Sequence, residues 1–407
     1  MPAAELLPLF YNAVRARLRQ SDFVPQTARR DSRCYVEISR SQVATNYRAV
    51  RDVVGPAAQV IGVVKADAYR HGAVEIARVL CAEGAPWLAV SSVEEGIALR
   101  SAGIACRLLV MAGVMSWERL AVREYKLTPV IHALEELRAF DEVGSRGEPL
   151  SIHLKIDTGM DRLGTRASAL EIAEAINAAP HIHVEGLMSH FASATDFTST
   201  QSDDQIEAFH QMVQALGSLG VRPPLMHFSS TNAIAYPRRR SVESSGWLSL
   251  VRPGHAIYGY VSPARGPAPH AVFTVQPALS WKTKIVAVKD VPAGARIGYG
   301  GSFQAPGPMR LAILAAGYAD GIPHRLSNKG KVIAGGRFAL IVGTVSMDLT
   351  TIDITQSPRL HAGDEVTLLG REGDVSLDAQ QIARTAGTIS YNVLCGISAR
   401  VKRFYID

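Results

Sequence analysis

The strongest constraint on the fold is a regular alternation of strand and helix patterns over some 200 residues, beginning at residue 60. Short apolar runs, many rich in β-branched residues, recur along this stretch, and amphipathic helical patterns lie between most of them. The eight runs are VIGVVK, WLAVSS, RLLVM, TPVIH, SIHLKID, VEGLMSH, LMHFSS and SLVRPG. They predict an α/β fold with an N-terminal (β/α)8 TIM-type barrel. An open doubly wound sheet is the alternative, but the first βα turn lacks the GxGxxG fingerprint usual there.

The sequence pattern changes after about residue 260, where SPARGPAPH leads into strand-like runs separated by glycine. These runs predict a mostly antiparallel β domain at the C-terminus. With 407 residues, of which 47% are hydrophobic, the chain is long enough for two domains with their own cores. We therefore expect an N-terminal extension and linker (1–33), a barrel domain (34–265) and a β-rich C-terminal domain (266–407).

The charge pattern favours small anionic metabolites over nucleic acid as partners. The net charge is +6, but the basic residues are scattered, and their densest run, Arg238 to Arg240, is only three long. No apolar run approaches the roughly 18 residues of a membrane span. The N-terminal 20 residues reverse the charge order of a secretory signal and predict a short amphipathic helix before a polar linker.

The four cysteines lie far apart in the sequence, at Cys34, Cys81, Cys106 and Cys395. They show neither the close spacing of a zinc site nor a CxxC pair. We therefore expect reduced, structural thiols in a cytoplasmic protein, and no metal site.

Lys65 directly follows an apolar run, Val60 to Val64, and so is expected at the carboxyl end of a strand. In α/β folds ligands bind at that edge. A lysine amine that is desolvated or lies beside other cations can have a lowered pKa and form a Schiff base with a carbonyl compound. The alternative is a lysine whose amine reaches solvent.

Other chemically useful residues recur at the expected strand ends. They are Arg162 after the fifth strand, His190 at the sixth, Ser229, Ser230 and Thr231 at the seventh, and Arg252 and Gly254 at the eighth. Together they predict one polar site in the barrel mouth. Hydroxyls of the seventh strand and backbone amides of the eighth would form a phosphate cradle beside the first strand. This suits pyridoxal phosphate, which needs an amine and a phosphate cradle; a sugar-phosphate barrel enzyme is the alternative.

Seven motifs make the chain resemble one family. In order they are VVKADAYRHGA, HLKIDTGMDRLG, GLMSHFA, VRPGHAIYG, IGYGG, AAGYADG and GTVSMDLTTID. Their order and rough spacing resemble those of the alanine racemases, fold-type III pyridoxal-phosphate enzymes of bacteria, from about Tyr35 to the C-terminus.

The resemblance implies a two-base racemisation of alanine. Lys65 would hold pyridoxal 5'-phosphate and act on one face of the substrate, and Tyr299 would act on the other. A free tyrosine has a pKa of about 10, so Tyr299 needs assistance, which in the family passes through residues matching His190 and Arg252. Arg252 would also face the pyridine nitrogen.

The resemblance assigns further residues to the cofactor and the substrate. The matches to cofactor-contacting positions are Tyr69, Thr231, Gly254, His255 and Tyr391, beside Ser230 and the residues above. Arg162 and Met347 match substrate-contacting residues, and Lys155 matches a lysine that is carbamylated in many members. Arg70 replaces the usual glycine of its motif and is expected to alter the loop and add charge near the barrel mouth. Asp161 is an unusual residue beside Arg162 and is expected to tune the orientation of that arginine.

The resemblance also implies a head-to-tail homodimer with shared sites, in which Tyr299 and Met347 approach the lysine site of a partner subunit. The implied role is the supply of D-alanine for cell-wall peptidoglycan. Alternatives are a racemase of broad or other specificity (serine, lysine or arginine), a decarboxylase of the same fold, and a cofactor-binding protein without turnover. Arg252 argues against a decarboxylase, which would normally have an acidic residue there, and the second domain argues against a simple binding protein.

Overall fold

The computed structural model describes residues 31–56, 58–145, 147–238 and 249–407, which form two compact units. Among these residues, the first unit comprises 43–68 and 73–276, and the second comprises 31–42, 69–72 and 277–407. The predicted N-terminal helix, most of the predicted linker, and Arg239 and Arg240 of the basic run lie outside the described residues.

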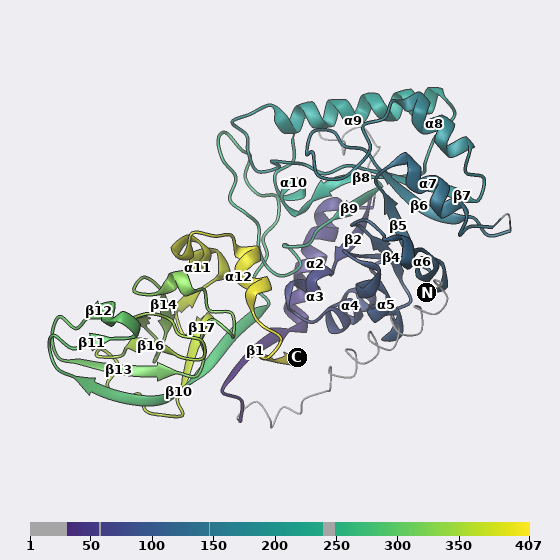
Figure 1. Cartoon of the computed structure of the whole chain (residues 1–407). Helices are drawn as coiled ribbons and strands as arrows, with labels where there is room; N and C mark the ends of the chain where they lie inside the picture. The colour runs from purple at the N-terminus through teal and green to yellow at the C-terminus, as the bar shows by residue number, and fades with distance from the viewer. Residues whose placement is uncertain (1–30, 57, 146, 239–248) are drawn as a thin grey trace. The chain divides into compact units, whose positions relative to one another are not determined.

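The first unit is built around eight parallel strands that close into a barrel in chain order, with β2 paired to β9 (Figure 1). The strands are β2 Gln59–Val63, β3 Trp87–Val90, β4 Arg107–Val110, β5 Thr128–Ile131, β6 Leu150–Lys155, β7 Ile182–Met188, β8 Leu225–Ser230 and β9 Leu250–Arg252. Each falls on one of the eight predicted runs, so the predicted barrel is confirmed. The runs lack alternation because a barrel strand is covered on both faces, and all four residues of β3 are buried.

Helices follow most barrel strands, as the amphipathic patterns predict. They are α4 Ala73–Ala82, α5 Val93–Ser101, α6 Arg119–Glu124, α7 Leu134–Asp141, α8 Ala169–Asn177, α9 Gln201–Ser218 and α10 Thr231–Ala235, whereas α2 Arg40–Val54 precedes the first barrel strand. In α9, Ile206, Phe209 and Leu216 are buried, which is the spacing of one helix face. Among the helices of the described residues, none has the length and apolar character needed to cross a membrane.

A left-handed turn follows Lys65 directly. The segment α3 (Lys65–Tyr69) has positive φ angles of 52 to 54° from Ala66 to Tyr69, none of which is glycine. Such a backbone costs about 1–2 kcal/mol per residue, so surrounding contacts must hold it. The Glu95 carboxylate accepts hydrogen bonds from the amides of Ala66 and Ser91, both at 2.7 Å. Asp67 accepts a bond from the amide of Ala73, the first residue of α4.

The second unit is mostly antiparallel sheet, as predicted. Its elements are β1 Cys34–Ser39, β10 Leu279–Val291, β11 Arg296–Ile297, β12 Phe303–Gln304, β13 Met309–Leu314, β14 Lys331–Ile333, β15 Phe338–Leu340, β16 Thr350–Asp353, β17 Glu365–Glu372, β18 Val375–Leu377, β19 Lys402–Ile406, α11 Ala379–Ala386 and α12 Ser390–Gly396. Strand β1 pairs with β10 and β19, so it belongs to this sheet rather than to the barrel domain that we expected from residue 34 onward. Its apolar pattern identifies a strand but not the partners, which lie more than 240 residues away.

Two turns of the second unit meet at Gly317. The amides of Tyr318 and Ala319 donate to the carbonyls of Ser346 and Met347 at 3.0 and 2.9 Å. A Cβ atom on Gly317 would overlap these two carbonyl oxygens. Glycine is therefore required for the approach of the turn that carries Met347.

Replacing Gly317 with alanine is expected to lower the free energy of unfolding by about 1–3 kcal/mol, because two backbone segments must separate. The matched control is Gly307→Ala, since no atom lies within 4 Å of a Cβ there. The control is expected to change the free energy by less than about 0.5 kcal/mol in the same denaturant titration. Equal stability of the two variants would contradict the proposed backbone contact.

Candidate active site

Lys65 lies at the mouth of the barrel, two residues beyond the end of β2, and is half-buried. The left-handed turn that follows it, held by Glu95, fixes where the chain leaves the strand. The structure thus places Lys65 at the carboxyl end of a central strand, where the sequence predicted it.

Arg252, the last residue of β9, makes several contacts in the barrel mouth, and its side chain is buried. Its Nη2 donates to the carbonyl oxygens of Ser189 (2.7 Å) and Phe228 (3.0 Å). The same nitrogen lies 3.2 Å from Nδ1 of His190, and Nη1 lies 2.6 Å from Nδ1 of His227. The guanidinium therefore joins the ends of β7, β8 and β9. Burial lowers the pKa of Arg252 to about 9, which leaves it protonated at neutral pH.

Two histidines continue the network into the barrel interior. Nε2 of His227 lies 2.7 Å from Nδ1 of His153, and both rings are fully buried. Because a guanidinium only donates, Nδ1 of His227 must accept from Arg252, so the proton of a neutral His227 lies on Nε2. His227 then donates to Nδ1 of His153. One arginine therefore fixes the tautomer of each ring.

All three histidines of the network, His153, His190 and His227, are neutral at neutral pH. Burial, followed by the charge of Arg252, lowers the pKa of His190 to about 3 and that of His227 well below its usual value. Burial, then the charges of Arg107 and Arg252, lowers the pKa of His153 to about 3. Neutral rings can accept from Arg252 without adding a second buried positive charge.

Lys155 ends β6 in the same polar site and is buried. Burial, and then the positive charges of Arg162 and Arg252, lower its pKa to about 8. Arg162 itself is exposed in the loop after β6. Its neighbour Asp161 forms an ion pair with Arg166, so Asp161 is bound to a different arginine from the one that we expected it to orient.

The predicted phosphate cradle has one hydroxyl at its centre. Oγ1 of Thr231 accepts hydrogen bonds from the amides of Gly254 and Ala256, each at 3.1 Å. The structure therefore brings Thr231 and Gly254 together at the ends of β8 and β9, beside Ser230. The Gly254 amide, which we expected to face a phosphate, donates to Thr231 here. The ring of His255 stacks on Tyr260, with centroids 5.0 Å apart.

The second unit places Tyr69 next to Tyr391, with ring centroids 6.0 Å apart. These tyrosines, predicted to contact phosphate, are more than 300 residues apart in the chain. The Nε of Arg70 lies 3.4 Å from the carbonyl of Cys395, so this unusual arginine contacts α12.

Tyr299 and Met347 project from the second unit, with exposed fractions of 76% and 54%. Tyr299 lies between Gly298 and Gly300, whose φ angles are +76° and +67°. The preceding Ile297 is buried in a cluster with Leu311 and Val342. Burial of Ile297 and the turn at Gly298 and Gly300 thus keep the side chain of Tyr299 exposed.

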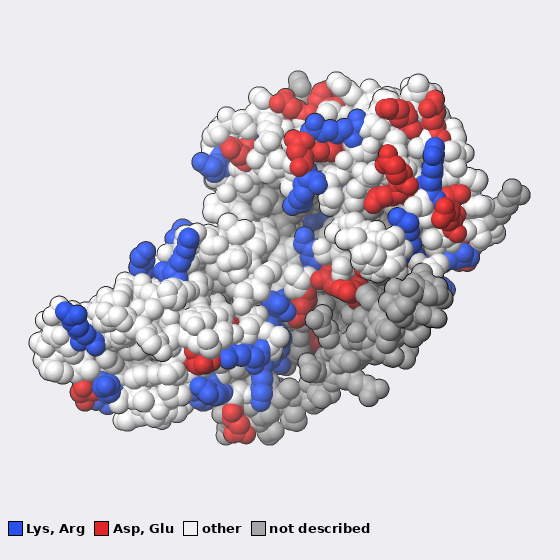
Figure 2. All heavy atoms as spheres, viewed as in Figure 1, with Lys and Arg blue, Asp and Glu red and all other residues white. Residues whose placement is uncertain are grey.

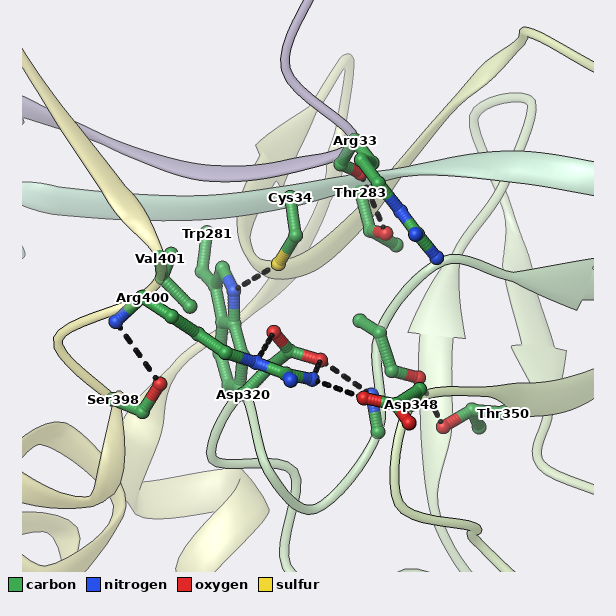
Figure 3. A network of polar contacts seen from close by, with 12 residues as sticks. Arg33, Cys34, Trp281, Thr283, Asp320, Asp348, Thr350, Ser398, Arg400 and Val401 are labelled. Atoms are coloured by element: carbon green, nitrogen blue, oxygen red, sulfur yellow. Dashed lines mark hydrogen bonds and ion pairs between the residues drawn. The ribbon is translucent and has the colours of Figure 1, made fainter.

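An arginine clamp braces the turn that carries Met347. In Figure 3, Arg400 lies between Asp320 and Asp348, with contacts of 2.7 and 2.8 Å to the first and 2.7 Å to the second. Asp320 is buried and also accepts a hydrogen bond from the amide of Gly317. The clamp therefore supports the same pair of turns that meet at Gly317.

Three residues of the site were not predicted from the sequence. His153 and His227 form the interior network, and Gln205 donates to the carbonyl of His190 at 3.0 Å. A signal for one of them was present: His153 and Lys155 are two residues apart on one strand and so share a face. Gln205 lies in α9 and gave no such signal.

Basic residues are scattered over the surface that Figure 2 shows, as they are along the sequence. Acidic and basic side chains are interspersed over the barrel on the face drawn in Figure 2. Within the part of the chain that the structure describes, no three His, Cys, Asp or Glu side chains are grouped to hold a metal ion.

Replacing Thr231 with valine is expected to lower the free energy of unfolding by about 1–3 kcal/mol, because two buried amides lose their acceptor. Thr231→Ser keeps the hydroxyl and is the matched control. Denaturant unfolding of cofactor-free protein measures both variants. A valine variant as stable as the serine variant would show that this hydroxyl does not hold the loop.

Comparisons with known proteins agree over both units. A family model described as "Alanine racemase, N-terminal domain" matches residues 38–263, and one described as "Alanine racemase, C-terminal domain" matches 278–405. An alanine racemase of Halothermothrix orenii is 36% identical over 373 residues, covering 91% of this chain and 96% of that protein.

Two solved structures extend the comparison to the fold. The alanine racemase of a D-cycloserine-producing Streptomyces lavendulae gives a TM-score of 0.83 at 32% identity, covering 92% of this chain and 97% of that one. The Bartonella henselae alanine racemase, with covalently bound pyridoxal phosphate, gives a TM-score of 0.80 at 25% identity, covering 92% and 100%.

Proposed function

This chain belongs to the alanine racemase family, and we propose that it interconverts L-alanine and D-alanine with pyridoxal 5'-phosphate. The observation that carries the proposal is the barrel mouth, where Lys65, the Thr231 hydroxyl and the buried Arg252 occupy neighbouring strand ends. The proposed role is the supply of D-alanine for the cell wall, in the cytoplasm.

The residues of the barrel mouth fit this cofactor. Lys65 provides an amine at the end of β2, and β8 and β9 provide hydroxyls and backbone amides on the neighbouring strands. We assign Tyr69, Tyr391, Ser230, Thr231, Gly254 and His255 to its phosphate side. When bound, pyridoxal phosphate supplies an aldehyde for amines and an electron-withdrawing ring that acidifies the α-hydrogen of the substrate.

Arg252 is proposed to face the ring nitrogen of the cofactor. A guanidinium donates hydrogen bonds but keeps its proton, because its pKa stays above neutral even in this buried site. Arg252 would therefore give the ring nitrogen a hydrogen bond rather than a proton, and the bound cofactor would withdraw electrons from the substrate less strongly. This favours simple racemisation over transamination or decarboxylation.

Lys65 and Tyr299 are proposed as the two acid/base groups. Inversion requires that one group remove the α-proton from one face while the other returns a proton to the opposite face. His190 assists the phenol: because its Nδ1 accepts from Arg252, the proton of neutral His190 lies on Nε2. That N–H would donate to the phenolate of Tyr299 and stabilise it.

The remaining two assignments concern substrate binding. Arg162 is proposed to bind the substrate carboxylate with a charge-assisted hydrogen bond, and Met347 to contact the substrate. Lys155 is proposed to be carbamylated and to position Arg162. Its pKa of about 8 supports this, because the neutral amine is the form that reacts with carbon dioxide.

A head-to-tail homodimer is proposed to complete each site. The exposure of Tyr299 and Met347 on a single chain supports an arrangement in which they act on the lysine site of a partner subunit. Two sites per dimer would then each draw residues from both subunits.

Purified protein with pyridoxal phosphate is expected to racemise L-alanine and D-alanine to the same equal mixture. Chiral chromatography should show alanine turning over at least about tenfold faster than serine, lysine or arginine, a preference of about 1.4 kcal/mol in the transition state. Lys65→Ala is expected to lose about a thousandfold or more of the rate. Release of carbon dioxide, or equal rates on lysine and alanine, would contradict the proposal.

Shared sites predict complementation between two inactive variants. Lys65→Ala and Tyr299→Phe homodimers are each expected to be nearly inactive. Unfolding and refolding an equal mixture should restore about a quarter of the wild-type activity, because half of the dimers are hybrids with one intact site. If both groups came from one chain, the mixture would remain as inactive as its parents.

A further inference from the structure

The fold brings together two cysteines that are 25 residues apart in the sequence. Cys81 lies in the last turn of α4, and Cys106 lies directly before β4. Their sulfur atoms are 3.2 Å apart, and both residues are half-buried. A disulfide bond needs about 2.05 Å, so a shift of roughly 1 Å would join them.

We propose that Cys81 and Cys106 are an oxidisable dithiol that reacts with a small anionic disulfide, such as glutathione disulfide, and closes to an intramolecular disulfide. This site is independent of the racemase chemistry. All four cysteines are free in the structure, and the proposal adds a reaction to the reduced, structural thiols that we expected.

The two sulfurs are not equivalent. The hydrogen bond between the two sulfur atoms, together with the charge of Arg100, lowers the pKa of Cys81 to about 7 despite partial burial. The same hydrogen bond, together with burial, raises the pKa of Cys106. Cys81 is therefore the nucleophile. Cys34 provides a contrast within the chain, because burial raises its pKa to about 12.

A basic cavity that is lined by the chain neighbours of Cys106 supports the preference for an anionic reagent. It has a volume of about 490 Å³, and it is lined by Ala105 and Arg107, the two chain neighbours of Cys106. Arg100, Arg123 and Lys126 also line it, against one carboxylate, Glu148. This positive charge raises the local concentration of small anions in a salt-dependent manner.

Arg100 also fixes the backbone at Cys106. Its Nη1 donates to the carbonyl oxygens of Ile104 and Cys106, both at 2.7 Å. Its Nε and Nη2 donate to the carbonyls of Tyr125 and Lys126, both at 3.0 Å. The sulfur of Cys106 is thus presented by an anchored loop, which reduces the conformational entropy lost on closing the bond.

The reaction balances with one molecule of the small disulfide. The Cys81 thiolate attacks one sulfur of the reagent, forms a mixed disulfide and releases one thiolate, which takes up a proton. Cys106 then loses its proton to solvent and attacks the Cys81 sulfur, which releases the second thiolate. Two protein thiols are oxidised by two electrons in all, and the reagent is reduced to two thiols.

The position of the pair predicts an effect on stability rather than on catalysis. Arg107 begins β4, whereas Lys65 lies beyond the carboxyl end of β2, so the bridge forms at the opposite end of the barrel from the site. Closing a loop of 25 residues restricts the unfolded chain. The oxidised protein is expected to have a Tm higher by about 5 °C and an unchanged racemisation rate.

The test treats folded wild type, Cys81→Ser and Cys106→Ser with glutathione disulfide and follows the products by peptide mass spectrometry. Wild type should yield a linked peptide pair containing Cys81 and Cys106. Cys106→Ser should accumulate the mixed disulfide at Cys81, and Cys81→Ser should react at least about tenfold more slowly. Cys34 should remain unmodified in all three proteins.

A second arm replaces glutathione disulfide with cystamine, which carries positive charges. For each reagent, the rate with the protein is divided by the rate with a small free thiol. This normalised rate should be several-fold lower for cystamine than for glutathione disulfide, and the difference should shrink as salt is added. Equal rates for Cys81→Ser and Cys106→Ser, or wild type that yields only mixed disulfides, would overturn the proposal. Neither result bears on whether the protein racemises alanine.

Discussion

A buried arginine organises the barrel mouth. Arg252 is 3% exposed, and its guanidinium bonds to backbone or ring acceptors at the ends of β7 and β8. A buried charge without acceptors would cost several kcal/mol, so these contacts must all form together. The guanidinium therefore links the ends of the three strands, next to His190 after β7 and Thr231 after β8.

The same arginine determines the arrangement of protons behind it. Because it cannot accept, it sets His227 and then His153 in single tautomers. The ring of His153 fits because residue 186 is glycine: a Cβ atom there would lie 2.7 Å from the ring. Trp87 packs edge-on against the same ring, with ring centroids 5.4 Å apart. The contacts with Gly186 and Trp87 thus hold the ring of His153 in the position where it accepts the hydrogen bond from His227.

The barrel and much of its mouth could be predicted from the sequence, because both follow from local patterns. Eight apolar runs identify eight strands, and strand ends identify Lys65, His190 and Arg252 as neighbours. Features that depend on distant pairing could not be predicted. The pattern of β1 does not reveal its partners, and the approach of Cys81 to Cys106 needs the fold. The left-handed turn after Lys65 gives no local signal either, because none of its positive-φ residues from Ala66 to Arg70 is glycine.

Neutral histidines of fixed tautomer hold an Arg252 side chain that is charged at neutral pH. Nitrogen-15 NMR of protein labelled at histidine, assigned with a His227→Gln variant, tests this arrangement most directly. The account predicts that His227 stays neutral from pH 8 down to pH 5, with Nε2 protonated and Nδ1 bare throughout. Uptake of a second proton by His227 with a midpoint of about 6.5, the ordinary value for an exposed ring, would contradict it.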